Sequence, residues 1–362
     1  MAYEKIEIHE RNLEARKKAF LKDKCISEED KKDILEFLRL ASLGKVNLRK
    51  RIGTSRLLKY LDGLKSLFHY FKKPFSKLTG KDIEQFEKEL TANKIKNKIT
   101  KKPYSESTKS DFKKTLKIYL KWKFKDNPER YPELIDWLDT SVKEKTPDYL
   151  KEGDIEKLYK GCKNNKERFL IAVLFDTGAR IEEFLNIRYE DIQEPDANSP
   201  YYKLTFKEEY SKTAGRTIGV YWKYSAEAIR DYLAEHHFKP SEPVYSDKYD
   251  NVRFLIGRLG KRVLKRRIYA HLFRHSSATY YAGKLNRQQL CYRYGWKFSS
   301  RMPDVYISRA GMVEEQVNEQ FKNEEIGALR ERLDKDEQTL KLVLDALREG
   351  RGVIKEASQK IK

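Results

Sequence analysis

The sequence predicts a mainly α-helical protein with one small β-hairpin or sheet, an α+β fold built from two domains. A chain of 362 residues is long enough for about two or three domains of ~150 residues each. Three patterns support this fold: helical spacing of apolar residues in the first third, a proline-rich connector, and a later alternating segment. We expect an N-terminal helical domain over 1–143, a second domain over 144–312, and a C-terminal helical extension over 313–362.

The composition favours a polyanionic partner and argues against a membrane protein. Lys and Arg number 77 against 56 Asp and Glu, which gives a net charge of +21. The longest apolar run, residues 169–175, is far shorter than the ~20 residues of a membrane-spanning helix. The charged start of the chain argues against a secretory signal, and three cysteines without a paired spacing argue against disulfides and a cysteine-ligated zinc site. We therefore expect a protein of the reducing cytoplasm, without a metal or other cofactor.

The positive charge is concentrated in the first domain. Residues 45–125 hold 24 Lys and Arg against 7 Asp and Glu. Apolar residues at helical spacing predict helices over 27–43 and 54–71, one that begins at Thr79, and one over 105–124. A surface that is merely solvated would spread its lysines along the chain, so we favour a phosphate-facing domain. The candidate DNA-contacting residues are Arg56, Lys59, Lys109, Lys113, Lys117 and Lys121 here and Arg216 in the second domain.

The connector, the hairpin and the extension follow in that order. Residues 126–148 place three prolines among charged residues, which is typical of an extended linker. Residues 200–222 alternate on both sides of a turn at 213–215 and predict a β-hairpin. Residues 314–349 carry apolar residues at helical spacing. This last helix either packs on its own domain or reaches a neighbouring subunit.

Five short signals line up in the second half of the chain. An arginine follows a glycine turn at a helix start, a lysine lies at the hairpin tip, and a histidine and an arginine stand one helical turn apart. A glycine–tryptophan pair and a late tyrosine come next. In chain order the side chains are Arg180, Lys212, His271 with Arg274, Trp296, and Tyr306.

This order resembles the catalytic pattern of the tyrosine recombinases, the phage-integrase family of site-specific DNA recombinases. The text TGARIEEFLNIRYEDI looks like the first-arginine box of that family, and YGWKFSSRMPDVY looks most like its archaeal branch and the related virus and plasmid integrases. The resemblance covers roughly residues 50–310 and includes a segment similar to the helical core-binding domain. It implies that this domain and the catalytic domain form a C-shaped clamp on duplex DNA.

The resemblance also implies a role for each residue. Tyr306 would attack a DNA phosphodiester and form a 3′-phosphotyrosine link, which needs no metal and no ATP. Arg180 and Arg274 would clamp the two non-bridging oxygens, where negative charge builds up in the transition state. His271 would hydrogen-bond the same phosphate or shuttle the proton of the nucleophile.

The remaining candidates assist that chemistry. Lys212 is the candidate general acid for the departing 5′-hydroxyl, because a lysine can release a proton where an arginine cannot. Trp296 can donate one hydrogen bond but cannot transfer a proton, so we interpret it as a positioning residue. Glu183 and His275 are expected to hold the catalytic side chains in place without contacting the substrate. The alternative for Lys212 is an ordinary solvent-facing lysine, because Lys203 and Lys207 lie on the same hairpin and most surface lysines face solvent.

The sequence therefore predicts an integrase or recombinase that acts on double-stranded DNA, with a homotetramer on two DNA sites and a location with the DNA of the nucleoid. Two alternatives use the same fold. A type IB topoisomerase would share the catalytic set and work as a monomer, and a catalytically silent DNA-binding protein would bind DNA without a covalent adduct.

Overall fold

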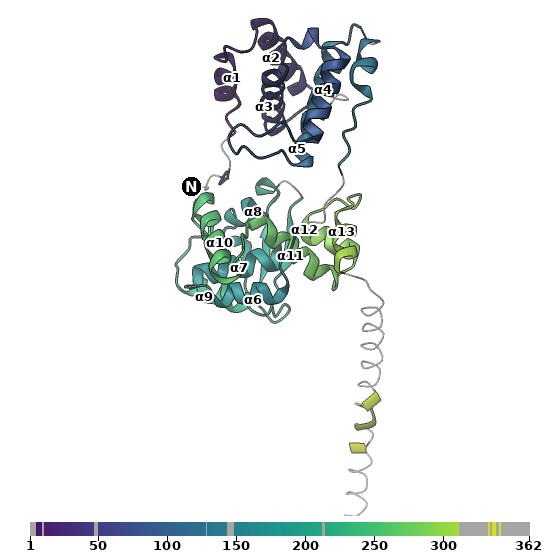
Figure 1. Ribbon diagram of the computed structural model, residues 1–362. Helices are drawn as coiled ribbons and strands as arrows, with labels where there is room; N and C mark the ends of the chain where they lie inside the picture. The colour runs from purple at the N-terminus through teal and green to yellow at the C-terminus, as the bar shows by residue number, and fades with distance from the viewer. Residues whose placement is uncertain are drawn as a thin grey trace, which may run out of the picture. The chain divides into compact units, whose positions relative to one another are not determined.

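The computed structural model divides into two compact units, which we call the N-terminal unit (His9–Lys145) and the C-terminal unit (Met1–Ile8 with Thr146–Lys362). The structure describes residues 5–8, 11–46, 50–127, 129–142, 148–211, 214–310, 332–333, 335–337 and 340–341. The predicted extension over 313–362 lies outside the described residues except for the last three short pieces. The fold class is confirmed, because helices dominate both units and one small sheet is present (Figure 1).

The N-terminal unit is a group of helices around an aromatic core. Phe37 lies at its centre, with ring centroids 5.3 Å from Tyr119 and 5.5 Å from Trp122. Phe68 and Phe75 are buried in the same core. The helices are α1 (Leu13–Leu21), α2 (Glu28–Ser42), α3 (Thr54–Phe71), α4 (Gly80–Thr91) and α5 (Glu106–Lys123), with the short turns η1 (Phe75–Lys77) and η2 (Pro132–Asp136).

Local sequence explains where these helices begin. Thr79 caps α4, and its amide and hydroxyl both donate to the Asp82 carboxylate at 2.8 and 2.7 Å. The side chain of Ser105 caps α5 by accepting from the amide of Thr108. The predicted helices therefore agree with the structure within one or two residues. Helix α1 is absent from the prediction because it buries only Phe20 and so has almost no apolar stripe.

The C-terminal unit is built around α7, the helix whose last nine residues are all buried. Helices α6, α9 and α11 pack against it. The predicted hairpin is confirmed: β2 pairs antiparallel with β3, and Leu204 lies opposite Ile218, both buried in the core. The elements are α6 (Glu152–Lys160), α7 (Asn165–Thr177), α8 (Ile181–Leu185), η3 (Tyr189–Asp191), β1 (Ile192–Gln193), β2 (Lys203–Phe206), η4 (Glu208–Tyr210), β3 (Arg216–Gly219), α9 (Ser225–Ala234), α10 (Tyr249–Val263), α11 (Ala270–Ala282), α12 (Arg287–Tyr294) and α13 (Met302–Ala310).

Residues 5–8 pack on the C-terminal unit, whereas the prediction places 1–143 in one domain. The amide of Ile6 donates to Asn186 Oδ1 at 2.8 Å, and Asn186 Nδ2 donates back to the carbonyl of Ile6 at 2.9 Å. Ile6 and Ile8 also lie against the core of that unit. Apolar residues of such a short segment carry no period, so the sequence gives no signal for this contact. No helix among the described residues is long and apolar enough to cross a membrane.

Candidate active site

A glycine turn sets the position of the first arginine. Helix α7 ends at Gly178, whose φ of +58° places it in the left-handed region. A Cβ at this position would meet the ring of Tyr294 and lie 2.9 Å from Ser277 Oγ, so only glycine fits. The chain then turns so that Arg180 caps α8.

The second arginine is held by two carbonyl oxygens. Arg274 on α11 is 3% exposed, and its two terminal nitrogens donate to the carbonyls of Gly178 and Tyr294, each at 2.7 Å. Its guanidinium also lies over the rings of Tyr294 and Trp296, 5.3 and 5.6 Å from their centroids. Burial and the charge of Arg180 lower the pKa of Arg274. Its positive charge is therefore poorly compensated, which favours an incoming anion.

Glu183 organises the charges behind Arg180. Its Oε1 accepts from Arg180 Nη1 at 2.9 Å and from the Ser211 hydroxyl at 2.6 Å, and its Oε2 accepts from Arg216 at 3.0 Å. Burial would raise the pKa of Glu183, but the charges of Arg216 and Arg274 and these hydrogen bonds outweigh burial and lower the pKa to about 2. The carboxylate thus stays ionised and orients Arg180.

Arg216 does not fit the DNA-contacting role that the sequence predicts for it. It begins β3 with a side chain only 1% exposed. Its Nε donates to the carbonyl of Arg293 at 2.8 Å, and its guanidinium lies 4.6 Å from the centroid of the Phe206 ring. The prediction is wrong here because the alternation of a half-buried strand turns this arginine toward Glu183 instead of solvent.

The two histidines lie on successive turns of α11. Their rings meet edge to face with centroids 4.5 Å apart. His271 is exposed on one side, and the packing around its ring together with the charges of Arg274 and Arg180 lowers its pKa. His275 is half-buried, and its Nδ1 lies 2.6 Å from the Tyr306 hydroxyl oxygen. Burial and the neighbouring positive charges lower the pKa of His275 to about 4, so its ring is neutral at neutral pH.

Tyr306 lies on α13 beneath a stack of aromatic rings. Its side chain is 1% exposed and stacks on Trp296, with centroids 5.3 Å apart and planes 4° from parallel. Trp296 stacks in turn on Tyr294 at 4.8 Å. Burial raises the pKa of Tyr306, and the charges of Arg274 and Arg309 partly offset this effect. The free protein therefore holds the phenol protonated.

Lys212 lies outside the described residues, so the structure does not place its side chain. Its neighbour Ser211 donates to Glu183, which brings the start of this turn to the arginine cluster. The site thus brings together Arg180, Arg274, His271, His275, Trp296, Tyr306 and Glu183 in the C-terminal unit.

Two buried charges of the site, Asp176 and Arg293, have no counterpart in the prediction. Asp176 is fully buried at the end of α7 and accepts from Arg293 at 2.8 Å and from the amide of Trp222 at 2.6 Å. The Tyr281 hydroxyl also donates to it. A carboxylate at the end of an apolar helix is the signal that could have revealed them, because such a charge must find partners. This network fixes α7 to α11 and α12 directly behind Gly178.

The lysines of α5 also depart from prediction. Lys109 is 6% exposed and pairs with Glu106 at 2.8 Å, so the DNA-contact prediction is wrong for it. Lys113 pairs with Glu87 at 2.5 Å, and Lys117 donates to the carbonyl of Asp136 at 2.9 Å, so both half-buried lysines have partners within the protein. Helical spacing of four places all three on one face of α5, where acceptors of the same unit lie within reach. Arg56, Lys59 and Lys121 are exposed, although Lys59 also pairs with Asp111.

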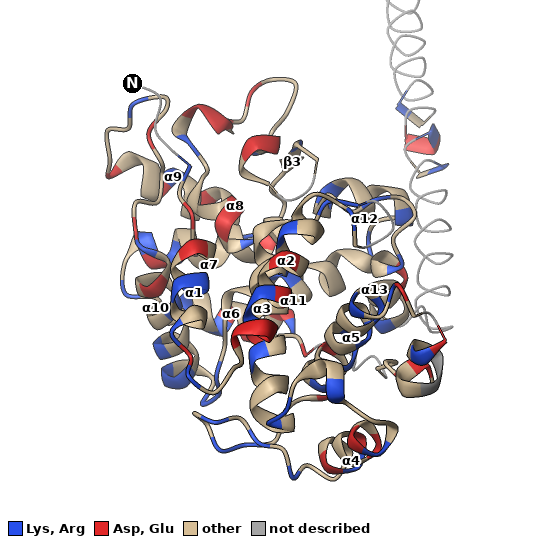
Figure 2. Ribbon diagram, turned by 90° about the horizontal axis from the view of Figure 1, so that it is seen from above, with Lys and Arg blue, Asp and Glu red and all other residues tan. Residues whose placement is uncertain are grey.

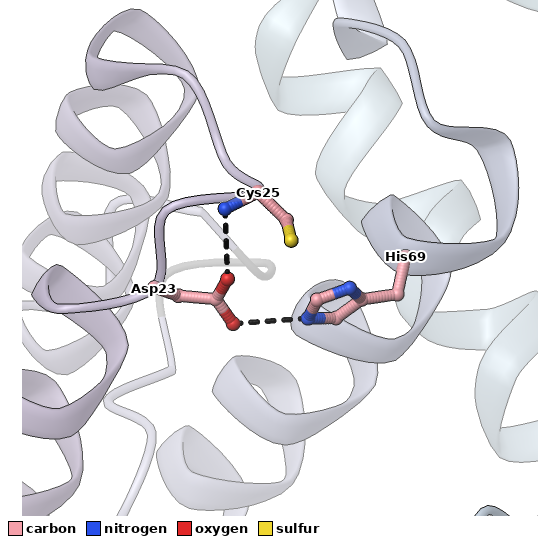
Figure 3. Close-up of side chains that lie close together, drawn as sticks. All are labelled: Asp23, Cys25 and His69. Carbon is pink, nitrogen blue, oxygen red and sulfur yellow. Dashed lines mark hydrogen bonds and ion pairs between the residues drawn. The ribbon is translucent and has the colours of Figure 1, made fainter.

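A second polar cluster lies in the N-terminal unit. Asp23, Cys25 and His69 have ligand-type atoms within 4.8 Å of one another (Figure 3). The Asp23 carboxylate is already occupied, because Lys65 lies 3.0 Å and His69 Nε2 2.9 Å from its Oδ2. An ammonium on the same oxygen opposes a cation there. We interpret the cluster as a structural contact that holds the loop after α1 against helix α3 through Asp23 and His69.

These features define a class of protein: a mainly helical domain with a paired-arginine site and a buried tyrosine on its last described full helix. No protein-family profile matches the chain. The tyrosine recombinase XerA of Saccharolobus solfataricus is 24% identical over 236 residues, which cover 63% of this chain and 72% of XerA. In solved structures, XerH bound to a palindromic difH substrate covers 88% of this chain and 98% of that chain, with a TM-score of 0.57 and 18% identity. A lambda integrase tetramer bound to a Holliday junction covers 76% of each chain, with a TM-score of 0.54 and 13% identity.

The fold and the sequence relatives agree with the order of residues around the site. The chain is similar in sequence to the tyrosine recombinase XerA and shares its fold with XerH, and the XerA match is compatible with the archaeal resemblance seen in the sequence.

Proposed function

We propose that this protein is a site-specific DNA recombinase that cuts and rejoins strands through a 3′-phosphotyrosine intermediate. The observation that carries the proposal is the juxtaposition on α11 and its neighbours: Arg274 is fixed by two carbonyls, and the Tyr306 hydroxyl is held 2.6 Å from a histidine of the same helix. A buried, pre-oriented guanidinium binds a phosphate without further rearrangement, which is what transition-state stabilisation requires.

The chemistry follows from the proposed roles. Arg180 and Arg274 bind the two non-bridging oxygens of the scissile phosphate, and each well-placed donor is worth ~3 kcal/mol in the transition state. Glu183 holds Arg180 in place through the contact of its Oε1. His271 reaches the same phosphate from its exposed edge, and Lys212 protonates the departing 5′-oxygen. Trp296 positions Tyr306 by stacking.

A basic cleft next to His271 supports DNA as the substrate. The cleft has a volume of about 700 Å³ and lies beside α10, which carries Lys and Arg on several turns (Figure 2). Four cations line it, together with the exposed ring of Phe254. Such a surface fits a phosphate backbone, and its affinity should fall steeply with added salt. The cations are Arg253, Arg258, Lys261 and Arg267.

The proposal extends to assembly and place. XerH and lambda integrase are described with DNA, and lambda integrase as a tetramer, so we propose that this chain works as a homotetramer on two duplexes. We further propose that both units contact the duplex and that the protein resides with DNA in the cytoplasm. Arg56, Lys59 and Lys121 are the exposed cations of the N-terminal unit that we retain as phosphate contacts.

The test is a nicked suicide duplex, on which cleavage traps a denaturant-stable protein–DNA adduct. Wild-type protein should form the adduct in EDTA and without ATP. Tyr306→Phe should abolish the adduct and keep DNA affinity, whereas Tyr189→Phe, a matched change outside the site, should leave both unchanged. An adduct with Tyr306→Phe would rule out this nucleophile. DNA binding without any wild-type adduct would instead indicate a silent DNA-binding protein.

A further inference from the structure

The histidine that touches the nucleophile is His275 and not the one that the sequence favours. Its Nδ1 lies 2.6 Å from the Tyr306 hydroxyl oxygen, a short hydrogen bond between α11 and α13. His271 makes its described ring contact with His275 and has no described hydrogen bond to Tyr306. His271 therefore lies near Arg180 and Arg274, whereas His275 contacts the phenol of Tyr306.

The protonation states of its partners allow this hydrogen bond to run from the phenol to the imidazole. The phenol is protonated, as its raised pKa indicates, and the imidazole of His275 is neutral. A neutral imidazole has one acceptor nitrogen. Among the described contacts, Nδ1 is the acceptor available to the Tyr306 proton. Proton transfer to His275 requires the tautomer in which the hydroxyl donates to Nδ1 and the ring carries its own proton on Nε2.

The surroundings of His275 determine when it can accept a proton. His271 and Arg274 face it from α11, Arg309 and Tyr306 face it from α13, and Asp148 approaches from the segment before α6. All except Asp148 and Tyr306 carry or can carry positive charge and lower the pKa of His275. A phosphate bound between Arg180 and Arg274 would add a nearby negative charge and raise that pKa. The base would thus become stronger when substrate is present.

We propose that His275 accepts the phenolic proton of Tyr306 during DNA cleavage and returns it during rejoining, while His271 serves the phosphate. This inference rests on the proposed function. It makes His275 a catalytic residue, because its Nδ1 contacts the attacking oxygen.

Bonds and protons balance in the proposed step. The O–H bond of Tyr306 breaks, its proton moves to Nδ1 of His275, and the phenolic oxygen forms a bond to phosphorus. The bond from phosphorus to the 5′-oxygen breaks, and that oxygen takes a proton from Lys212. In rejoining, the 5′-hydroxyl gives its proton back to the neutral amine of Lys212 and its oxygen bonds to phosphorus. The bond from phosphorus to the Tyr306 oxygen breaks, and the imidazolium of His275 returns its proton to that oxygen.

The experiment measures the rate of adduct formation on the suicide duplex from pH 6 to 9. His275→Asn retains an acceptor near the Nδ1 position but cannot take a proton, and His275→Ala removes both properties. His236→Asn makes the same change at a histidine just after the end of α9, where the ring contacts Tyr232 and Phe238, and serves as the control. A second substrate carries sulfur in place of the 5′-oxygen, because a thiolate leaves without a general acid.

The expected results separate a base from a structural residue. His275→Asn should lower the rate at neutral pH about 100-fold or more, and its rate should climb steadily with pH while the wild-type rate stays level. The sulfur substrate should not restore it. Added imidazole should partly restore His275→Ala, which it could not do for a misfolded protein.

Wild-type rates and pH dependence in His275→Asn would overturn the inference and leave the proposed function standing, and so would full recovery on the sulfur substrate. Failure of His275→Ala to respond to imidazole, with DNA binding retained, would also count against it. Absence of a wild-type adduct would overturn both proposals.

Discussion

Replacement of Gly178 by alanine tests whether one turn supports the whole site. The left-handed φ of this residue costs a non-glycine residue ~1–2 kcal/mol. The added methyl group also meets the ring of Tyr294 and lies 3.1 Å from Ser277 Cβ, and overpacking of this kind costs ~1–3 kcal/mol. We therefore expect Gly178→Ala to lose about 2–5 kcal/mol of unfolding free energy. The carbonyl of Gly178 holds Arg274, so the rate of adduct formation should fall as well.

The assay is urea unfolding followed by circular dichroism, with Gly257→Ala as the matched control. Gly257 lies inside α10, and a Cβ there would have nothing within 4 Å, so alanine should stabilise the helix by up to ~1 kcal/mol. The two substitutions are chemically identical and opposite in expected sign. Equal unfolding midpoints for Gly178→Ala and wild-type protein would refute the reasoning.

Three further results are expected. Asp176→Asn should cost about 3–5 kcal/mol in urea unfolding, because it leaves Arg293 buried without its carboxylate, and a change below ~1 kcal/mol would contradict the network. The pKa of Glu183 is lowered to about 2 in the folded protein, so this group stabilises the fold above its unfolded pKa of ~4.5, and that stability is lost as the pH falls toward 2. In thermal melts, the stability of Glu183→Gln should therefore change less with pH between these two values than that of the wild type. Tetranitromethane should nitrate Tyr292, which is 58% exposed, well before Tyr306, which is 1% exposed, and peptide mass spectrometry that finds equal rates would argue against the buried phenol.

The sequence predicts the helices well where one face is strongly apolar. The predicted 54–71 helix is α3, because Leu57, Leu61, Leu64 and Phe68 repeat at the helical period and are buried together. The turn before Arg180 is also predictable, since glycine is needed at its left-handed position. The α3 helix and the turn before Arg180 depend on residues close together in the sequence, and the spacing of apolar residues and glycines reveals them.

The errors concern which way a charged side chain faces. A lysine row along α5 reads as a solvated or phosphate-facing surface, yet Lys109 and Lys113 meet Glu106 and Glu87. The sequence places Arg216 on the hairpin as an exposed cation, but in the structure it pairs with Glu183, which lies 33 residues away in the chain. Such partners are set by tertiary packing, which single-sequence patterns do not contain. The choice between the two histidines of α11 depends on the same information, because only the placement of α13 shows which ring meets Tyr306.

The ring stack has a mechanical consequence. The carbonyl of Tyr294 accepts a hydrogen bond from Arg274, and its hydroxyl lies 2.8 Å from the Ser277 hydroxyl. Its ring stacks on Trp296, and Trp296 stacks on Tyr306. An imidazole in place of the indole would offer a hydrogen bond but much less surface to stack on. Arg274 and Tyr306, for which we propose anion binding and nucleophilic attack, are therefore both held by Tyr294, the first through its carbonyl and the second through the ring of Trp296. We expect a shift of α13 to displace Arg274 through these two stacking contacts.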